Sequence, residues 1–368
     1  MRSIARSVGV TAVAFAVSGC ALPYYWQAAA GHLALLRGRE PIEAVLADPR
    51  QKPGVRETLE LVVEMRRFAV EHLALPDNES YRSYVDLGRP YVVWNVVATE
   101  EFAVEPARWC FPLLGCVSYR GYFERADAER FVAKLENQGL DTYLAGANAY
   151  STLGYFDDPV LNTMLAGGEH YVAGILFHEL AHQKLYLKGD SDFNEAFATA
   201  VQQHGTAAWL SAHGSPETVE AFRRGLERHA DFADLIAAQQ ARLLEIYASD
   251  LSDEAKRAAK RAAFDAMRAE YEISKAGWGG VTEYDAWFAQ PLNNAQLASV
   301  ATYRRWLPGL TWYLEREGLA AFYAQMQTLA ELAEDRRAAR LQGWLDAAEA
   351  SGSRSGAERI TRAGYPPP

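Results

Sequence analysis

The stretch FHELAHQKLYLKGDSDFNEAFAT, residues 177–199, restricts the fold more than any other part of the sequence. His178 and His182 are four residues apart in a segment with helical periodicity, so both imidazoles lie on one helix face. The segment is otherwise apolar, and burying two imidazoles without partners is costly. With Glu179 beside the first histidine, the pattern is the HExxH arrangement of zinc sites. It predicts a buried helix that holds one Zn²⁺, in preference to two packed histidines without a metal.

A catalytic zinc site needs a third protein ligand and an open coordination position. Glu195 lies on the next predicted helix, which can fold back after Gly189 because several small residues follow: Ala196, Ala198 and Ala200. Asp192 is the alternative third ligand. We expect Glu195 to complete the site with His178 and His182. Glu179 stays free to accept a proton from water, as a general base must.

Hydrophobic periodicity predicts an α+β fold that is mostly helical, with a small β-sheet beside the histidine helix. Asp192 is expected to cap the second helix of the pair, and Ser215 the helix that follows it. The predicted helices cover residues 56–75, 125–138, 170–187, 193–213, 216–247, 252–273, 293–306 and 312–352, with a break at Pro308. The predicted strands cover residues 91–97, 117–123 and 142–144, with an edge strand at 149–155.

The N-terminus reads as an export signal. Arg2 and Arg6 precede an apolar run, residues 8–17, that is too short to span a bilayer. It ends in VSGC, which resembles a bacterial lipobox, and this resemblance implies lipid on Cys20 and, because Ala21 follows, sorting to the outer membrane. The alternative is an ordinary cleaved signal. We therefore expect a signal peptide over 1–20, a peptidase domain over 21–353 with sub-lobes at 21–165 (α/β) and 166–353 (helical), and a flexible tail over 354–368.

The net charge and the number of cysteines limit which classes of binding partner and which cellular compartment are expected for this chain. The formal net charge is −10, which repels phosphate backbones, so nucleic acid is not an expected partner. The chain has three cysteines, and lipid on Cys20 leaves an even pair in an oxidising compartment. Cys110 and Cys116 are six residues apart across a turn, which predicts a disulfide rather than two buried thiols.

Five sequence blocks together resemble the bacterial family of secreted HExxH proteins called putative aminopeptidases. They are the lipobox, WCFPLLGCVSYRGYF, AYSTLGYFDDPVL, FHELAHQKLY with FNEAFAT, and PLNNAQLASVATY. The HExxH helix followed by NEAFA is similar to the gluzincin arrangement. The resemblance implies a gluzincin-like zinc-peptidase core with a peptide substrate. The His182–Glu195 spacing is shorter than in thermolysin-like patterns.

The same resemblance implies further site residues. In gluzincins a strand before the zinc helix binds the peptide in extended form, which here gives the segment Tyr150, Ser151, Thr152, Leu153, Gly154 and Tyr155. A core strand is the alternative role for that segment. The tetrahedral oxyanion also needs a hydrogen-bond donor. The candidates are Tyr303, Tyr155 and His204, of which Tyr303 is the one we select.

The sequence therefore predicts zinc-dependent peptide-bond hydrolysis in the bacterial cell envelope, by an aminopeptidase attached to the outer membrane through lipid on Cys20 and facing the periplasm. Two alternatives remain. One is an envelope endopeptidase that acts on proteins or peptidoglycan peptides. The other is a non-catalytic structural zinc lipoprotein, which would have no need of Glu179 and would usually close its site with a fourth protein ligand. The sequence does not indicate an oligomeric state.

Overall fold

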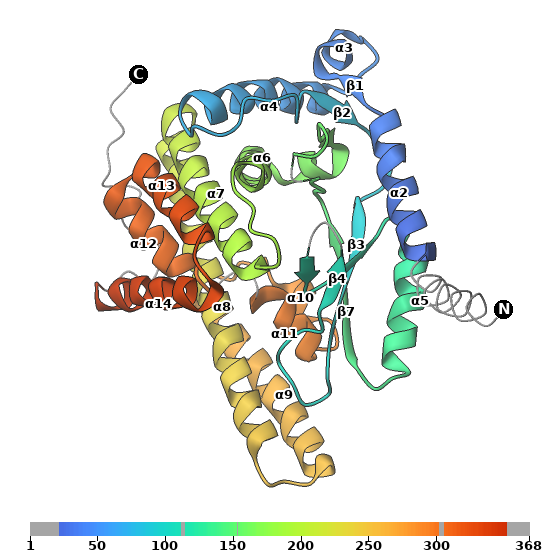
Figure 1. Cartoon of the computed structure of the whole chain (residues 1–368), viewed down its shortest axis with the longest axis vertical. Helices are drawn as coiled ribbons and strands as arrows, with labels where there is room; N and C mark the ends of the chain where they lie inside the picture. Colours follow the sequence, from blue (N-terminus) through green and yellow to red (C-terminus); the bar gives the residue numbers. More distant parts are fainter. Residues whose placement is uncertain (1–21, 112–114, 153, 302–304, 352–368) are drawn as a thin grey trace, which may run out of the picture.

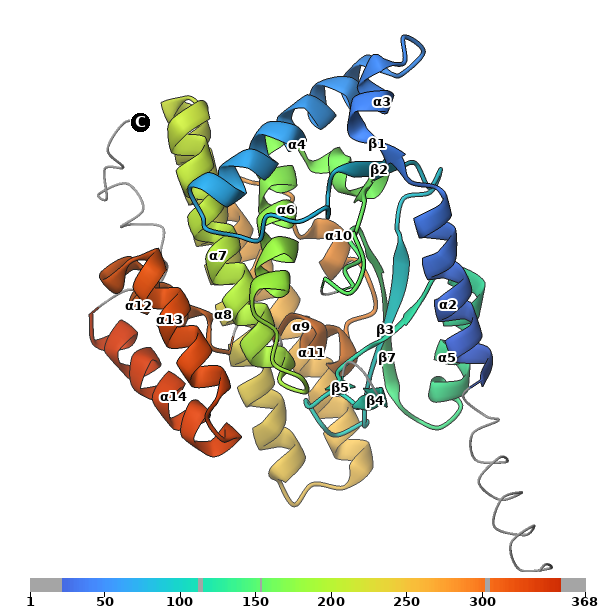
Figure 2. The ribbon, with the colours of Figure 1, turned by 45° about the horizontal axis from the view of Figure 1, so that its top comes forward.

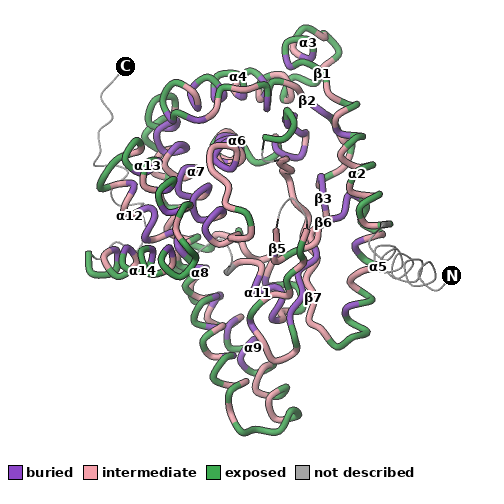
Figure 3. The backbone as a smooth tube through the Cα atoms, in the orientation of Figure 1, coloured by how far each residue is buried: buried purple, intermediate pink, exposed green. Residues whose placement is uncertain are grey.

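The computed structural model describes residues 22–111, 115–152, 154–301 and 305–351. Two central helices carry the candidate ligands: α6 (Glu169–Lys184), which contains the HExxH motif, and α7 (Ser191–His213), which contains Glu195. Trp209, near the end of α7, donates a hydrogen bond to the Glu169 carboxylate at the beginning of α6 (2.8 Å), so the two helices are antiparallel. Both have mostly buried inner faces (Figure 3).

The main hydrophobic core lies around this pair and draws side chains from Leu35 to Trp344. Figures 1 and 2 show α4 across one end of α6 and α7, and α12, α13 and α14 together along the side of α7. A second core lies between α8, α9 and α10. These helices are α4 (Pro53–Glu71), α8 (Pro216–Ala248), α9 (Asp253–Gly277), α10 (Asp285–Phe288), α12 (Leu307–Glu317), α13 (Leu319–Ala330) and α14 (Glu334–Ala350).

An antiparallel sheet of three strands, in the order β6-β3-β7, lies beside the helical part. Its strands are β3 (Val93–Thr99), β6 (Arg120–Tyr122) and β7 (Asp141–Ala147). Val96 and Ala98 of β3 pack toward α5 (Arg125–Glu136), whereas Val97 packs toward α11 (Asn294–Ala301). Successive side chains of a strand point to opposite faces, so a helix on each face buries β3 from Val96 to Thr99.

Short strands complete the fold. α2 (Leu22–Arg37) is followed by β1 (Glu40–Pro41) and α3 (Ile42–Ala47). β1 pairs with β2 (Ser83–Val85), and β2 pairs with β8 (Val160–Leu161). The 3₁₀ helix η1 (Asn162–Gly167) follows β8 along the chain. β4 (Trp109–Phe111) and β5 (Gly115–Val117) form a separate hairpin. Cys110 lies directly opposite Cys116 in this hairpin and is disulfide-bonded to it, as predicted.

The mostly helical α+β class is confirmed. The Ser215 hydroxyl caps α8 by accepting from the Thr218 amide, as predicted, and Asn293 caps α11 by accepting from the Gln296 amide. The predicted cap of α7 is wrong by two residues: Asp190 accepts from the Phe193 amide, whereas Asp192 already lies in the first turn.

Other predicted boundaries are also wrong. The strand predicted at 117–123 is two strands, because the chain leaves the β4–β5 hairpin after Val117 and joins β3 at Arg120. The helix predicted at 312–352 is divided by Gly318, whose φ of +80° is left-handed and ends α12. Pro308 does not break this region, because it occupies the first turn of α12, where a missing amide proton has no consequence.

Several expectations fall outside the described residues: the signal over 1–20 with Cys20, the tail over 354–368, Leu153 and Tyr303. Within the ranges that the structure describes, no helix is both long and apolar enough to span a bilayer.

Candidate metal centre

His178, His182 and Glu195 meet at one point between α6 and α7. The two histidine Nε2 atoms are 3.1 Å apart, and Oε2 of Glu195 lies 3.3 Å from Nε2 of His178 and 3.7 Å from Nε2 of His182. Among the described residues, these three form a cluster of histidine, cysteine and acidic side chains that could hold a metal ion. The predicted helix pairing therefore brings the three expected ligands together.

The spacing of the three atoms fits a tetrahedral zinc ion. Ligands bonded to zinc at about 2.0–2.1 Å stand about 3.3 Å apart in a tetrahedron, close to the separations seen here. One oxygen and two imidazole nitrogens are also a donor set that zinc commonly takes in catalytic sites. The residues present therefore fit a zinc ion, which His178, His182 and Glu195 would hold.

The surroundings of the cluster orient its ligands. Nδ1 of His178 lies 3.0 Å from Oε1 of Gln202 on α7, so the ring donates there and directs the Nε2 lone pair to the cluster. Burial alone lowers the pKa of His178, but Glu195 outweighs this effect and raises it. Burial alone raises the pKa of Glu195, but His182 and His178 hold it well below its usual range. Glu195 is therefore a carboxylate ready to act as a ligand.

The loop between the helices places Glu195. The Asn194 side chain accepts from the Leu187 amide and donates to the Leu187 carbonyl, both at 2.7 Å. Asp190, which caps α7, is held by Arg337 of α14 at 2.7 Å. Asn194 thus supports the site by holding the loop that leads to Glu195.

Asp192, the alternative third ligand, lies outside the metal cluster. Its carboxylate forms an ion pair with Arg305 at 3.5 Å. Asp192 lies in the first turn of α7, one turn before Glu195, and the group of side chains that could hold a metal ion contains Glu195 and not Asp192. The structure therefore favours Glu195 over Asp192 as the third ligand.

Glu179 lines an open cavity of about 1770 Å³, and His178, His182 and Glu195 line the same cavity. The cavity lies between α6, α7 and α8 on one side and α2 with the sheet on the other, and aromatic side chains make up much of its wall. They include Tyr24, Tyr25, Phe111, Tyr119, Tyr155 and Phe156. The volume exceeds the 300–1,000 Å³ typical of small-molecule sites and leaves room for a ligand as large as a short peptide.

The edge strand predicted at residues 149–155 is wrong. The Thr152 amide donates to Asp158, and the Phe156 amide donates to the Thr152 hydroxyl, so these groups are not free for a strand ladder. Gly154 has a left-handed φ of +82°, which turns the chain. The described residues of the segment still line the cavity, namely Tyr150, Ser151, Thr152 and Tyr155.

Asp158 connects this segment to α6. Its buried carboxylate accepts from the Thr152 amide and hydroxyl, at 2.9 and 2.8 Å, and lies 3.5 Å from Nε2 of Gln183 on α6. Burial raises the pKa of Asp158 to about 6, against the opposing effect of its hydrogen bonds. Asp158 is therefore a structural anchor beside the site and not a surface for substrate.

Of the three predicted oxyanion donors, Tyr155 and His204 lie within the described residues. Tyr155 is 68% exposed at the rim of the cavity, and His204 is not among the described residues that line the cavity. Two other tyrosines, Tyr119 and Tyr186, line the cavity beside the ligands, and burial together with Glu195 raises the pKa of both phenols. The sequence reasoning missed them because no local spacing relates them to the HExxH motif.

Fold and site together define a helical α+β protein with a two-histidine, one-glutamate cluster under a peptide-sized cavity. The family model described as "Putative aminopeptidase" matches residues 23–341, most of the chain, and the protein belongs to this family. The family description indicates a peptidase acting on peptide substrates. A search of curated proteins and a search of solved structures each return no significant match.

Proposed function

We propose that the protein is a zinc-dependent peptidase of the bacterial cell envelope, and specifically an aminopeptidase with a gluzincin-like core. One observation carries the proposal: His178, His182 and Glu195 meet at zinc-ligand spacing, with Glu179 beside them at the wall of a peptide-sized cavity. The three ligands hold a single Zn²⁺. When bound, this ion supplies a Lewis acid that activates water and polarises a carbonyl group.

Glu179 is the general base. Its carboxylate accepts the proton of the water that attacks the scissile carbonyl and delivers it to the amine nitrogen, while the new C–O bond forms and the C–N bond breaks. Glu179 follows His178 directly on α6, so it reaches the same cavity without joining the ligand set. A free carboxylate in this place has a use in hydrolysis and none in a purely structural zinc site.

The location proposed for the enzyme is the periplasmic face of the outer membrane, with lipid on Cys20 as the anchor. The support is the VSGC sequence after a basic and apolar start, and a disulfide between Cys110 and Cys116, which is typical of oxidising compartments. Radiolabelled palmitate incorporation tests this point. Wild type should carry the label, a Cys20→Ala variant should lose it, and an unlabelled wild type would contradict the anchor.

The deciding experiment compares wild type with Glu179→Gln on a peptide library, with zinc content measured in parallel. We expect one zinc ion per chain in both proteins and a fall in hydrolysis of about 100-fold or more in the variant. Zinc-replete wild type that cleaves no peptide would instead indicate a structural site. Matched peptides with free and acetylated N-termini then separate an aminopeptidase from an endopeptidase, since only an endopeptidase cleaves both.

A further inference from the structure

We propose that the disulfide-bonded hairpin of β4 and β5 seats on the loop between the two ligand helices and holds Tyr119 at the metal centre. There the Tyr119 hydroxyl donates a hydrogen bond to the carbonyl oxygen of the scissile peptide. This inference rests on the proposed peptidase function. It names the residue that stabilises the negative charge on that oxygen, a role that sequence reasoning gave to Tyr303.

The hairpin meets the ligand loop backbone against backbone. A Cβ added to Gly115 would lie 2.9 Å from the backbone nitrogen of Gly189 and 3.0 Å from its Cα, so no larger residue fits without moving the loop. Gly115 also has a φ of +80°, which favours glycine. Gly189 lies in the loop that joins α6 to α7, so the hairpin rests on the connection between the two ligand helices.

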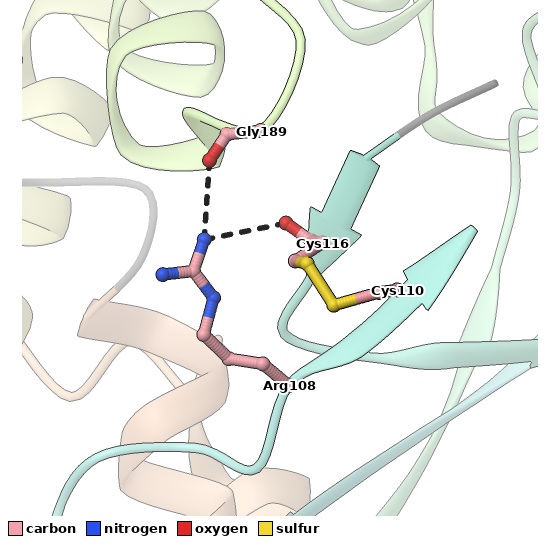
Figure 4. Close-up of a disulfide and its surroundings, with 4 residues drawn as sticks. All are labelled: Arg108, Cys110, Cys116 and Gly189. Atoms are coloured by element: carbon pink, nitrogen blue, oxygen red, sulfur yellow. Dashed lines mark hydrogen bonds between the residues drawn. A yellow bond between two sulfur atoms is a disulfide. The ribbon is translucent and has the colours of Figure 1, made fainter. Parts of the chain in front are cut away.

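A side chain bridges the same two parts. Nη2 of Arg108 donates to the carbonyl oxygen of Gly189 at 3.1 Å and to that of Cys116 at 3.4 Å, as Figure 4 shows. The disulfide joins Cys116 to Cys110 across the two strands. Because Arg108 is exposed, its hydrogen bonds contribute little stability. The close contact between Gly115 and Gly189 is therefore the main contact between the hairpin and the loop.

The hairpin leads directly to Tyr119. This residue lies between β5, which ends at Val117, and β6, which begins at Arg120 and pairs with Val96 in the main sheet. Both neighbouring segments are thus fixed, one by the disulfide hairpin and the other by the sheet. A position held on both sides is suited to placing one side chain accurately.

Tyr119 faces the same cavity as the candidate metal ligands. It lines the cavity together with His178, Glu179 and Glu195, and it lies close enough for the charges of Glu195 and Glu179 to act on its phenol. As a whole residue Tyr119 is 36% exposed, so it borders open space that a peptide can fill. A tetrahedral intermediate carries a negative oxygen, and a donor fixed beside it is worth about 100- to 1,000-fold in kcat.

The first test replaces the hydroxyl alone. In Tyr119→Phe we expect kcat to fall about 100-fold, with KM changed by less than about threefold and zinc content unchanged. A phosphinic peptide, whose tetrahedral oxygens resemble the intermediate, should bind about 100-fold more weakly by calorimetry. Tyr186→Phe is the matched comparison, because Tyr186 lines the same cavity and also feels Glu195. Loss of kcat in Tyr186→Phe with wild-type kcat in Tyr119→Phe overturns the assignment.

The second test loosens the hairpin. A Cys110→Ser/Cys116→Ser variant and a Gly115→Ala variant should each lower kcat while retaining zinc, and should speed hydrogen exchange over residues 115–122. Combining either change with Tyr119→Phe should add little further loss, because both act through one side chain. Gly139→Ala is the control: Gly139 also has a positive φ, +84°, but a Cβ there meets nothing within 4 Å. It should keep wild-type kcat.

The outcomes separate this inference from the function beneath it. Wild type that binds zinc but cleaves no peptide overturns both. Wild type that cleaves peptides, with Glu179→Gln inactive and Tyr119→Phe fully active, overturns the role of Tyr119 alone. Additive losses in the combined hairpin and Tyr119 variants overturn the claim that the hairpin acts by positioning Tyr119.

Discussion

His178 of α6 and Gln202 of α7 are joined by a hydrogen bond of 3.0 Å between Nδ1 and Oε1. The same two helices supply the ligands of the candidate metal centre, so this bond holds a ligand ring from the neighbouring helix. An amide oxygen can only accept here, which places the ring proton on Nδ1 and the lone pair on Nε2. The bond therefore selects the tautomer that a metal requires.

Replacing Gln202 by Leu should weaken zinc binding by about 10- to 100-fold, because the imidazole loses its orienting partner. Competition with a chromogenic chelator measures the change, and circular dichroism should show an unchanged helix content. Gln342→Leu, an exposed glutamine on α14, is the matched control and should bind zinc like wild type. Equal affinity in the two variants would contradict the orienting role.

Glu195→Gln should lower zinc affinity by at least about 100-fold, since the change removes a charged ligand while keeping its shape. Asp192→Asn should leave zinc affinity unchanged, because Asp192 forms its ion pair with Arg305 outside the cluster. Metal analysis after dialysis compares the two. A zinc-free Asp192→Asn protein beside a zinc-loaded Glu195→Gln protein would assign the third ligand to Asp192 instead.

Asp158 should make the protein less stable as pH rises from about 4 to about 6. Its pKa is raised in the folded state to about 6 by burial, so folding favours the protonated form, and this stabilisation is lost once the folded carboxyl ionises. The difference in unfolding free energy between wild type and Asp158→Asn should therefore fall by about 2–3 kcal/mol over this range. Urea titrations at several pH values measure it. Asp157→Asn, at the exposed neighbouring position, is the control variant.

Two helical glycines should respond oppositely to alanine. A Cβ on Gly205 of α7 would lie 2.6 Å from a Leu73 side-chain atom and 2.9 Å from Phe177, so Gly205→Ala should destabilise the protein by about 1–3 kcal/mol. A Cβ on Gly343 of α14 meets nothing within 4 Å, so Gly343→Ala should stabilise it by about 0.5–1 kcal/mol. Thermal unfolding gives both signs, and a shift in the same direction for both would refute the packing argument.

Sequence patterns predicted the helix pair and the three-residue cluster well, because both depend on local spacing. His178 and His182 share a face through helical geometry alone, and a short loop with Gly189 returns Glu195 to them. The disulfide follows from a cysteine count and a turn. Each of these features depends on contacts between residues that are close along the chain, and a local sequence pattern can predict such contacts.

The errors lie where distant residues decide the local structure. The segment at 149–155 has strand-like composition, but the buried carboxylate of Asp158 captures the Thr152 amide that a ladder would use. Tyr119 comes to the cavity because a hairpin rests on a loop about seventy positions later in the chain, a contact that no local pattern encodes. Long-range packing overrode the strand propensity of residues 149–155. In the second case, long-range packing brought Tyr119 to the cavity.

The two hydrogen bonds between the Asn194 side chain and the Leu187 backbone fix the length of the connecting loop. The Asn194 side chain bonds both the amide and the carbonyl group of Leu187. The geometry of these bonds fixes the number of residues between Leu187 and Asn194. One inserted residue within the loop would either break this pair or turn Glu195 about 100° around the axis of α7. Insertions and deletions in residues 188–193 should therefore be far less tolerated than substitutions there.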